Sequence, residues 1–299
     1  MAEDPCKVQP LATALQSGLP QTARQTLSPA PESQLPGRNK SLAGGSAGRH
    51  TGNQLDRMKN GPSIFVKALA LWLLASTGLV TFCAWPNRRD RATVGMAWGL
   101  ILLWILLGGT LMRRFREPIR GVLSKLRLDW RLKFILFATV LALAEEAVTT
   151  TMTNLAPLFG VRLGEAYITA SSNYLDVVAL HSVVVFVPMF VAWALMLWRY
   201  DFSPFAVFVL FGLTGTLAEM SLGFQHVLEF GFWIFVYGLM VYLPAYCVPS
   251  ERKVHKPRWW HYPLAIVTPF LFLPLVPLPL LAKLLSPNHP KIHFPPIGG

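Results

Sequence analysis

The sequence predicts an all-α protein, a polytopic integral membrane helical bundle of about seven transmembrane helices. Of the 299 residues, 53% are hydrophobic and only 14% are charged, with a mean hydropathy of +0.43. Soluble domains carry about 25% charged residues. Apolar stretches follow one another along the chain, each long enough to cross about 30 Å of hydrocarbon as a helix. The cysteines, Cys6, Cys83 and Cys247, are scattered, which excludes a disulfide-stapled module.

Residues 1–60 differ in composition from the rest of the chain. They are rich in Ser, Gly, Pro, Gln and Ala and contain no apolar run, so they bury too little surface to offset the entropy of ordering. We expect a disordered cytoplasmic tail. Met58, followed by a basic residue and then an apolar core, is an alternative start, and we expect that apolar segment to be retained as a helix.

Residues 61–285 form the predicted transmembrane helical domain. Its spans are expected at about 63–85, 93–112, 133–156, 175–198, 204–225, 228–248 and 262–284. The last contains five prolines, which remove backbone hydrogen bonds that lipid cannot replace. A broken or re-entrant last segment would reduce the count to six. Residues 286–299 are a Pro-rich C-terminal tail.

The distribution of positive charge predicts the orientation. Beyond residue 60, the segments on the N-terminal side of seven spans hold 13 Lys and Arg residues, and those on the opposite side hold 6. Because cytoplasmic loops carry the excess of Lys and Arg, the N-terminus is expected in the cytoplasm, and the C-terminus across a plasma or inner membrane. The net charge of +12 is therefore mostly a topology signal, and we expect no nucleic-acid partner. The oligomeric state is left open.

The basic segment 113–133 has an amphipathic pattern. Its apolar residues share one face at helical spacing, and arginines and lysines occupy the remainder; the apolar positions are Ile119, Val122, Leu123, Leu126 and Trp130. A short interfacial helix with its basic face on anionic lipid headgroups would satisfy this pattern. A solvated positive-inside loop is the equally weighted alternative.

The predicted third span carries two adjacent carboxylates, Glu145 and Glu146. Threonines and Asn154 follow them at helical spacing, so the outer half of this helix has a broad polar face. An ionisable group at the centre of a membrane helix costs about 2.5–3.5 kcal/mol, and two neighbouring carboxylates do not both ionise cheaply. The pair suits a proton relay, a metal site or a general acid. Helix packing explains the hydroxyl groups but not the pair of carboxylates.

The fourth and fifth spans add further polar groups. The fourth begins with Asn173 and Asp176 near the outer interface and holds His181 deeper, with Pro188 two turns later to loosen the helix. In the fifth, small residues at helical spacing flank Glu219, so this carboxyl is expected to face a neighbouring helix; these residues are Gly212, Gly215 and Gly223. A close helix contact with a protonated, hydrogen-bonded Glu219 is the structural alternative.

Depth counting places these groups in one layer. Glu145 lies roughly 18 Å from the predicted cytoplasmic end of its span, and Glu219 and His181 lie roughly 24–25 Å from theirs. The sequence therefore predicts a catalytic or metal-binding cluster in the outer half of the bilayer, for a divalent metal such as zinc; it comprises Glu145, Glu146, His181 and Glu219. A polar mouth is expected above it, formed by Asn154, Asn173, Asp176, His226 and Glu229.

No motif fixes the reaction. The chain lacks Walker A, G-x-G-x-x-G, C-x-x-C and H-E-x-x-H patterns. Three classes of function stay open. The first is an intramembrane enzyme that uses the Glu/His cluster for metal-assisted or acid–base chemistry on a membrane substrate. The second is a proton- or cation-coupled transporter or channel. The third is a membrane scaffold in which the polar layer only specifies helix packing.

Overall fold

In a computed structural model of the chain, residues 48–221 and 223–295 are described, apart from the side chains of residues 48–63 and 224–226. The described residues form helices and loops without a β-sheet, which confirms the predicted fold class. The helices are α1 (Gly48–Ala84), α2 (Arg88–Leu100), η2 (Ile101–Gly108), α3 (Gly109–Lys125), α4 (Trp130–Asn154), η3 (Ala156–Phe159), α5 (Tyr174–Asp176), η4 (Val177–His181), α6 (Val183–Arg199), α7 (Pro204–Met220), η5 (Phe224–Glu229), α8 (Phe230–Tyr246), α9 (His261–Phe272), η6 (Leu273–Leu275) and α10 (Leu278–Leu285).

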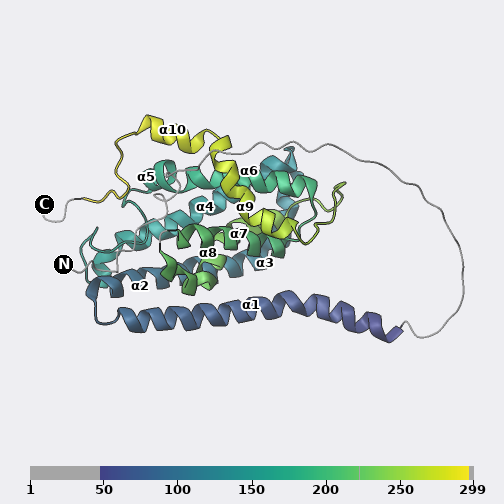
Figure 1. Cartoon of the computed structure of the whole chain (residues 1–299), viewed down its shortest axis with the longest axis horizontal. Coiled ribbons are helices and arrows are strands. Elements are labelled where there is room, and N and C mark those ends of the chain that lie inside the picture. The colour runs from purple at the N-terminus through teal and green to yellow at the C-terminus, as the bar shows by residue number, and fades with distance from the viewer. Residues whose placement is uncertain (1–47, 222, 296–299) are drawn as a thin grey trace, which may run out of the picture. The chain divides into compact units, whose positions relative to one another are not determined.

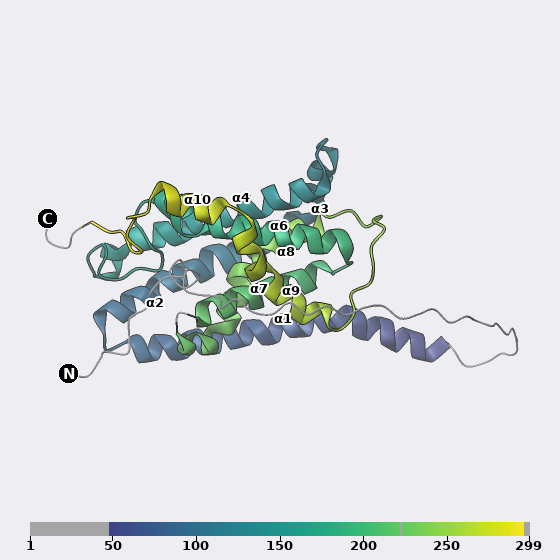
Figure 2. The same cartoon turned by 45° about the horizontal axis from the view of Figure 1, so that its top comes forward.

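The described part of the chain divides into two compact units, one that ends at residue 68 and one that begins at Leu69. Residues 1–47 of the predicted tail lie outside the described residues. From Leu69 onward, α4 packs against α6 and α8, α7 packs against α8, and α9 lies across α6 and α7 (Figures 1 and 2). The arrangement is that of a helical membrane bundle.

The described helices do not fix the number of membrane spans, so the seven that we expected stay a prediction. By length and composition, three described helices qualify as spans, Ile64–Ala84, Arg88–Lys125 and Val227–Tyr246, and the number rises to five if each of two bent pairs counts as one. The helix α7 has 17 residues, which at about 1.5 Å each falls short of a hydrocarbon core about 30 Å thick. In α4, the carboxylates and threonines break the apolar run. The orientation stays a prediction.

The second predicted span is longer than expected. The chain is helical without a break from Arg88 to Lys125, through a π-helical stretch at Ile101–Gly108. The basic residues from Arg113 to Lys125 therefore continue the same helix as α3, and their contact with lipid headgroups stays a prediction. Buried Trp104 fixes this long helix to α8, because its indole N–H donates to the carbonyl of Val236 at 3.0 Å.

Two apolar segments are bent. The helices Tyr174–His181 and Val183–Arg199 meet at 49°, so the break lies at Ser182, whereas we expected Pro188 to loosen the helix. The last apolar segment bends by 44° between Leu275 and Leu278. Two prolines near this bend, Pro274 and Pro277, have no N–H to donate to a helical carbonyl, as the sequence indicated.

Glycines allow α7 and α8 to approach closely. A methyl group on Gly212 would lie 2.7 Å from the Cα and the carbonyl oxygen of Ile234, and one on Gly238 would lie 2.6 Å from the carbonyl oxygen of Phe208. Both contacts are with backbone, which cannot move aside as a flexible side chain can. Small residues at such a crossing allow extensive van der Waals packing, so this helix pair depends on the two glycines.

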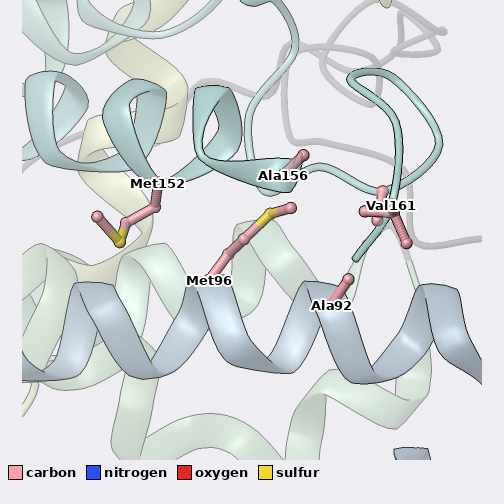
Figure 3. Packing of buried hydrophobic residues seen from close by; sticks show 6 residues of the cluster. Ala92, Met96, Met152, Ala156 and Val161 are labelled. Atoms are coloured by element: carbon pink, nitrogen blue, oxygen red, sulfur yellow. The ribbon is translucent and has the colours of Figure 1, made fainter. Parts of the chain in front are cut away.

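A smaller apolar cluster positions the loop that follows α4. Ala92 and Met96 of α2 face Met152 at the end of α4, together with Ala156 and Val161 (Figure 3). Because Val161 belongs to the loop between η3 and α5, this contact anchors the segment that leads to Asn173 and the start of α5.

The glycine contact is tested by the substitution Gly212→Ala. The added methyl group forces α7 away from α8, and we expect the free energy of unfolding to fall by about 1–3 kcal/mol. Gly121→Ala is the matched control, because nothing lies within 4 Å of a methyl group at that helical position. Unfolding of the purified protein in mixed micelles, followed by tryptophan fluorescence, measures both variants. Equal stability of the two would contradict the close contact.

Candidate functional site

The structure brings together three of the predicted carboxyl groups. Glu145 and Glu146 of α4 and Glu219 of α7 are each at most 6% exposed. Charges on Glu146 and Glu219 interact with Glu145, and all three carboxyl groups interact electrostatically with the hydroxyl of Tyr237 on α8. The structure therefore brings these groups close together, while their depth in the bilayer stays a prediction. We call Glu145, Glu146, Glu219 and Tyr237 the carboxyl cluster.

Hydrogen bonds hold the members of the carboxyl cluster. The hydroxyl of Tyr237 donates to Oε1 of Glu219, and the hydroxyl of Thr149 donates to Oε1 of Glu145 at 2.9 Å. Ser182 lies within hydrogen-bonding range of the Glu146 carboxyl. Gly215 makes room for this arrangement, because a methyl group there would lie 2.0 Å from the Tyr237 ring. The small residues around Glu219 therefore admit an aromatic side chain from the neighbouring helix.

His181 takes part in a different cluster. It joins Asp176 and two histidines, His289 and His293, from the segment after α10, which returns to α5 (Figure 1). We call these four residues the Asp/His cluster. The structure thus divides the predicted Glu/His cluster, with its glutamates in the carboxyl cluster and its histidine in the Asp/His cluster.

A π-turn explains how Asp176 and His181 face the same side. The N–H of Ser182 donates to the carbonyl of Val177, five residues earlier, at 2.9 Å. Residues five apart come together in such a turn, so His181 returns to the side of Asp176. Asn173 starts this segment, since its side-chain oxygen accepts the N–H of Leu175 at 3.0 Å.

The C-terminal histidines are held by backbone and aromatic contacts. The N–H of His293 donates to the carbonyl of Ala170 at 2.8 Å, and Phe294 stacks on Tyr167 with ring centroids 5.0 Å apart. These contacts fix the segment 289–294 to the loop before α5. The position of both imidazoles therefore does not depend on their bonds to Asp176 alone.

The two carboxylate oxygens of Asp176 face different histidines. Oδ1 lies 2.8 Å from Nε2 of His289, and Oδ2 lies 3.3 Å from Nδ1 of His293 and 3.9 Å from Nε2 of His181. Nε2 of His181 also lies 3.1 Å from Nε2 of His289. The side chains of Asp176 and His181 are 9% and 5% exposed, whereas that of His293 is 56% exposed. The cluster is therefore buried on the His181 side and accessible on the His293 side.

The geometry of the Asp/His cluster fits a metal ion. One ligand atom each from Asp176, His289 and His293 lie within 4.8 Å of one another. Zinc binds histidine nitrogen and carboxylate oxygen at about 2.0–2.2 Å, so two ligands on a tetrahedral ion lie roughly 3.4 Å apart. Two histidines and one carboxylate suit zinc and also ferrous iron.

The residues predicted at the mouth do not form one group in the structure. Asp176 belongs to the Asp/His cluster and Asn173 begins α5, while the Asn154 amide donates to the carbonyl of Ser172 at 2.9 Å. Glu229 lies directly before α8 and is partly buried. The side chain of His226 lies outside the described residues.

Sequence reasoning missed His289 and His293. Both lie in the segment that we treated as a Pro-rich tail, and a count of depth within the spans assigns no place to such a segment. Their H-x-x-x-H spacing, which is common among metal ligands, was a usable signal.

Comparison of the chain with family models, curated proteins and solved structures finds no match. Interpretation of the site therefore rests on the chemistry of its own residues.

A conservative pair of variants tests the carboxyl cluster. Thr149→Val removes the donor to Glu145 inside the bundle, and we expect the free energy of unfolding to fall by about 1–2 kcal/mol. Thr151→Val is the control, because that exposed hydroxyl donates only to the backbone of its own helix, at the carbonyl of Ala147. Unfolding in mixed micelles compares the two variants, and a loss of equal size in both would show that the bond to Glu145 adds nothing.

Proposed function

We propose that this multi-pass membrane protein is a metal-dependent enzyme whose divalent transition-metal ion is held by Asp176, His289 and His293. The observation that carries the proposal is the convergence of these side chains, from segments 117 residues apart, with His181 beside them. Imidazole and carboxylate are common ligands of zinc. Because these residues meet only in the folded chain, the unfolded chain would not bind the ion.

The exposure of the site favours catalysis over a structural role. Structural zinc is surrounded by four protein ligands, whereas catalytic zinc has three and keeps one position for water or substrate. His293 borders the accessible side of the cluster, which leaves space for such a position. An ion held by Asp176, His289 and His293 would supply Lewis-acid activation of water for hydrolysis.

The location of the site favours an amphiphilic substrate. Asp176 and His181 belong to the short arm of a bent apolar helix pair, and the mouth residue Asn173 begins that arm. A substrate with an apolar body in the bilayer and a hydrolysable ester, amide or phosphoester group near the surface would reach the ion. We therefore place the reaction in the class of metal-assisted hydrolysis at a membrane interface.

We rank this function above cation or proton transport because packing contacts account for much of the carboxyl cluster. Thr149 and Tyr237 each donate a hydrogen bond to one carboxyl, which is the interaction expected of polar residues between membrane helices. Catalysis by the Asp/His cluster does not require these glutamates to ionise.

Metal binding is the first test. The purified full-length protein, stripped with a chelator, is expected to bind one zinc or cobalt ion per chain. Asp176→Asn and His289→Ala each remove a ligand and are expected to weaken binding about 100-fold or more. His255→Ala is the control, because that histidine is exposed on the segment after α8. Titration followed by elemental analysis measures the affinity, and no bound ion in the wild type overturns the proposal.

A second test asks whether the ion keeps an open position. Cobalt-loaded protein is expected to change its visible absorption when azide is added, because the small anion replaces bound water on the metal. His255→Ala should respond as the wild type does. A spectrum that stays unchanged at saturating azide would mean a closed set of four ligands, with His181 as the fourth, and would exclude the catalytic role while leaving metal binding intact.

A further inference from the structure

A second site of interest lies away from both clusters. A partly open cavity of about 310 Å³ is found between the end of α3, the first turns of α4 and the segment that follows α8. Its lining combines apolar side chains, among them Leu123, Phe134 and Phe137, with the cations Arg120 and Lys133. Apolar and cationic groups around one cavity match a ligand with an acyl part and an anionic part.

The charge of the cavity is positive at neutral pH. Burial raises the pKa of the Cys247 thiol to about 11, so this lining residue is neutral. Glu251 is the acidic residue among those that line the cavity, against the two cations. Among the described residues, neither Arg120 nor Lys133 has a carboxylate within 4.0 Å, whereas Arg131 nearby is bound by Asp129 at 2.8 Å.

A further cation stands beside Arg120. The guanidinium groups of Arg116 and Arg120 lie 5.1 Å and 5.7 Å from the centre of the Tyr246 ring, at the end of α8. Cation–π contacts of this kind hold a guanidinium in place without neutralising it. Glu117 offsets part of the charge, since it accepts a hydrogen bond from the Tyr246 hydroxyl and lies 3.9 Å from Arg116. Arg120 therefore keeps its charge available at the cavity.

The cavity lies where two spans leave the hydrocarbon. The candidate spans Arg88–Lys125 and Val227–Tyr246 both end beside it. Arg120 lies about two helical turns beyond Met112, the end of the apolar run, on the side of the span where lipid headgroups lie. Trp130, which also lines the cavity, belongs to the residue type enriched at that depth.

We propose that this cavity binds an anionic phospholipid, with the phosphate between Arg120 and Lys133 and the start of an acyl chain along Leu123, Phe134 and Phe137. A volume of 310 Å³ equals that of about ten liquid waters, so it holds the phosphate, the glycerol and the first methylenes while the rest of the lipid stays in the bilayer. Basic cavities between membrane helices bind phospholipid headgroups in this way. The site is independent of the proposed metal centre.

Native mass spectrometry of the full chain tests the proposal. Phosphatidylglycerol and phosphatidylcholine with identical chains are offered to the protein in detergent, and we expect the anionic lipid to bind at least about tenfold more tightly. The double variant Arg120→Gln with Lys133→Gln is expected to lose that preference. The double variant Arg127→Gln with Arg131→Gln removes the same net charge outside the lining and should keep it.

Two further arms separate the outcomes. Leu123→Ser changes the apolar part of the lining and should weaken the binding of phosphatidylglycerol. Binding of glycerol phosphate, which has no acyl chain, should be the same in this variant as in the wild type. Inorganic phosphate should not displace the bound phospholipid. Equal binding of the two phospholipids by the wild type overturns the proposal, and so does a preference that survives in the Arg120/Lys133 variant. Displacement by inorganic phosphate at similar concentration would show that the cavity binds small anions, and it would overturn the proposal of a lipid site.

Discussion

An ionisable side chain that enters the bundle loses water and gains stability from a partner in the protein, and this constraint shapes the contacts of Glu219 and Asp176. A single helix supplies few such partners, so most come from elsewhere in the chain. Glu219 takes its partner, Tyr237, from the neighbouring helix, and Asp176 takes His289 from the segment after α10. Because an unpartnered charge costs several kcal/mol in a medium of low polarity, the polar groups also select which helices lie together.

One irregular turn serves both groups of polar residues. The π-turn that ends at His181 directs that imidazole to the Asp/His cluster, while the next residue, Ser182, lies beside Glu146 of the carboxyl cluster. In a regular α-helix, side chains five residues apart point to different faces, so Asp176 would not meet His181. Irregular turns of this type often mark functional sites in membrane and soluble helices, and here the bend of the helix pair follows from the same turn.

The parts of the structure that follow from local periodicity could be predicted. Helical rise alone placed Glu145 and Glu219 in one layer, and the spacing of small residues indicated a close neighbour for Glu219. The break at Ser182 and the partners of His181 could not be predicted in this way, because they depend on tertiary contacts. Hydropathy describes each segment by itself, so it gave no place to His289. Hydropathy also does not say where a helix ends, and α7 ends after 17 residues, so the number of spans stays a prediction.

The Asp/His cluster joins residues that are far apart in the chain and close only after the helices have packed. An unassembled polypeptide offers the same side chains, but the entropy of closing so long a loop works against their meeting on one ion. The proposed coordination of an ion would therefore become favourable only at the end of folding. Uptake of the ion would then report that the bundle is correctly assembled, and cellular metal supply would bear on how much of the protein persists in the bilayer.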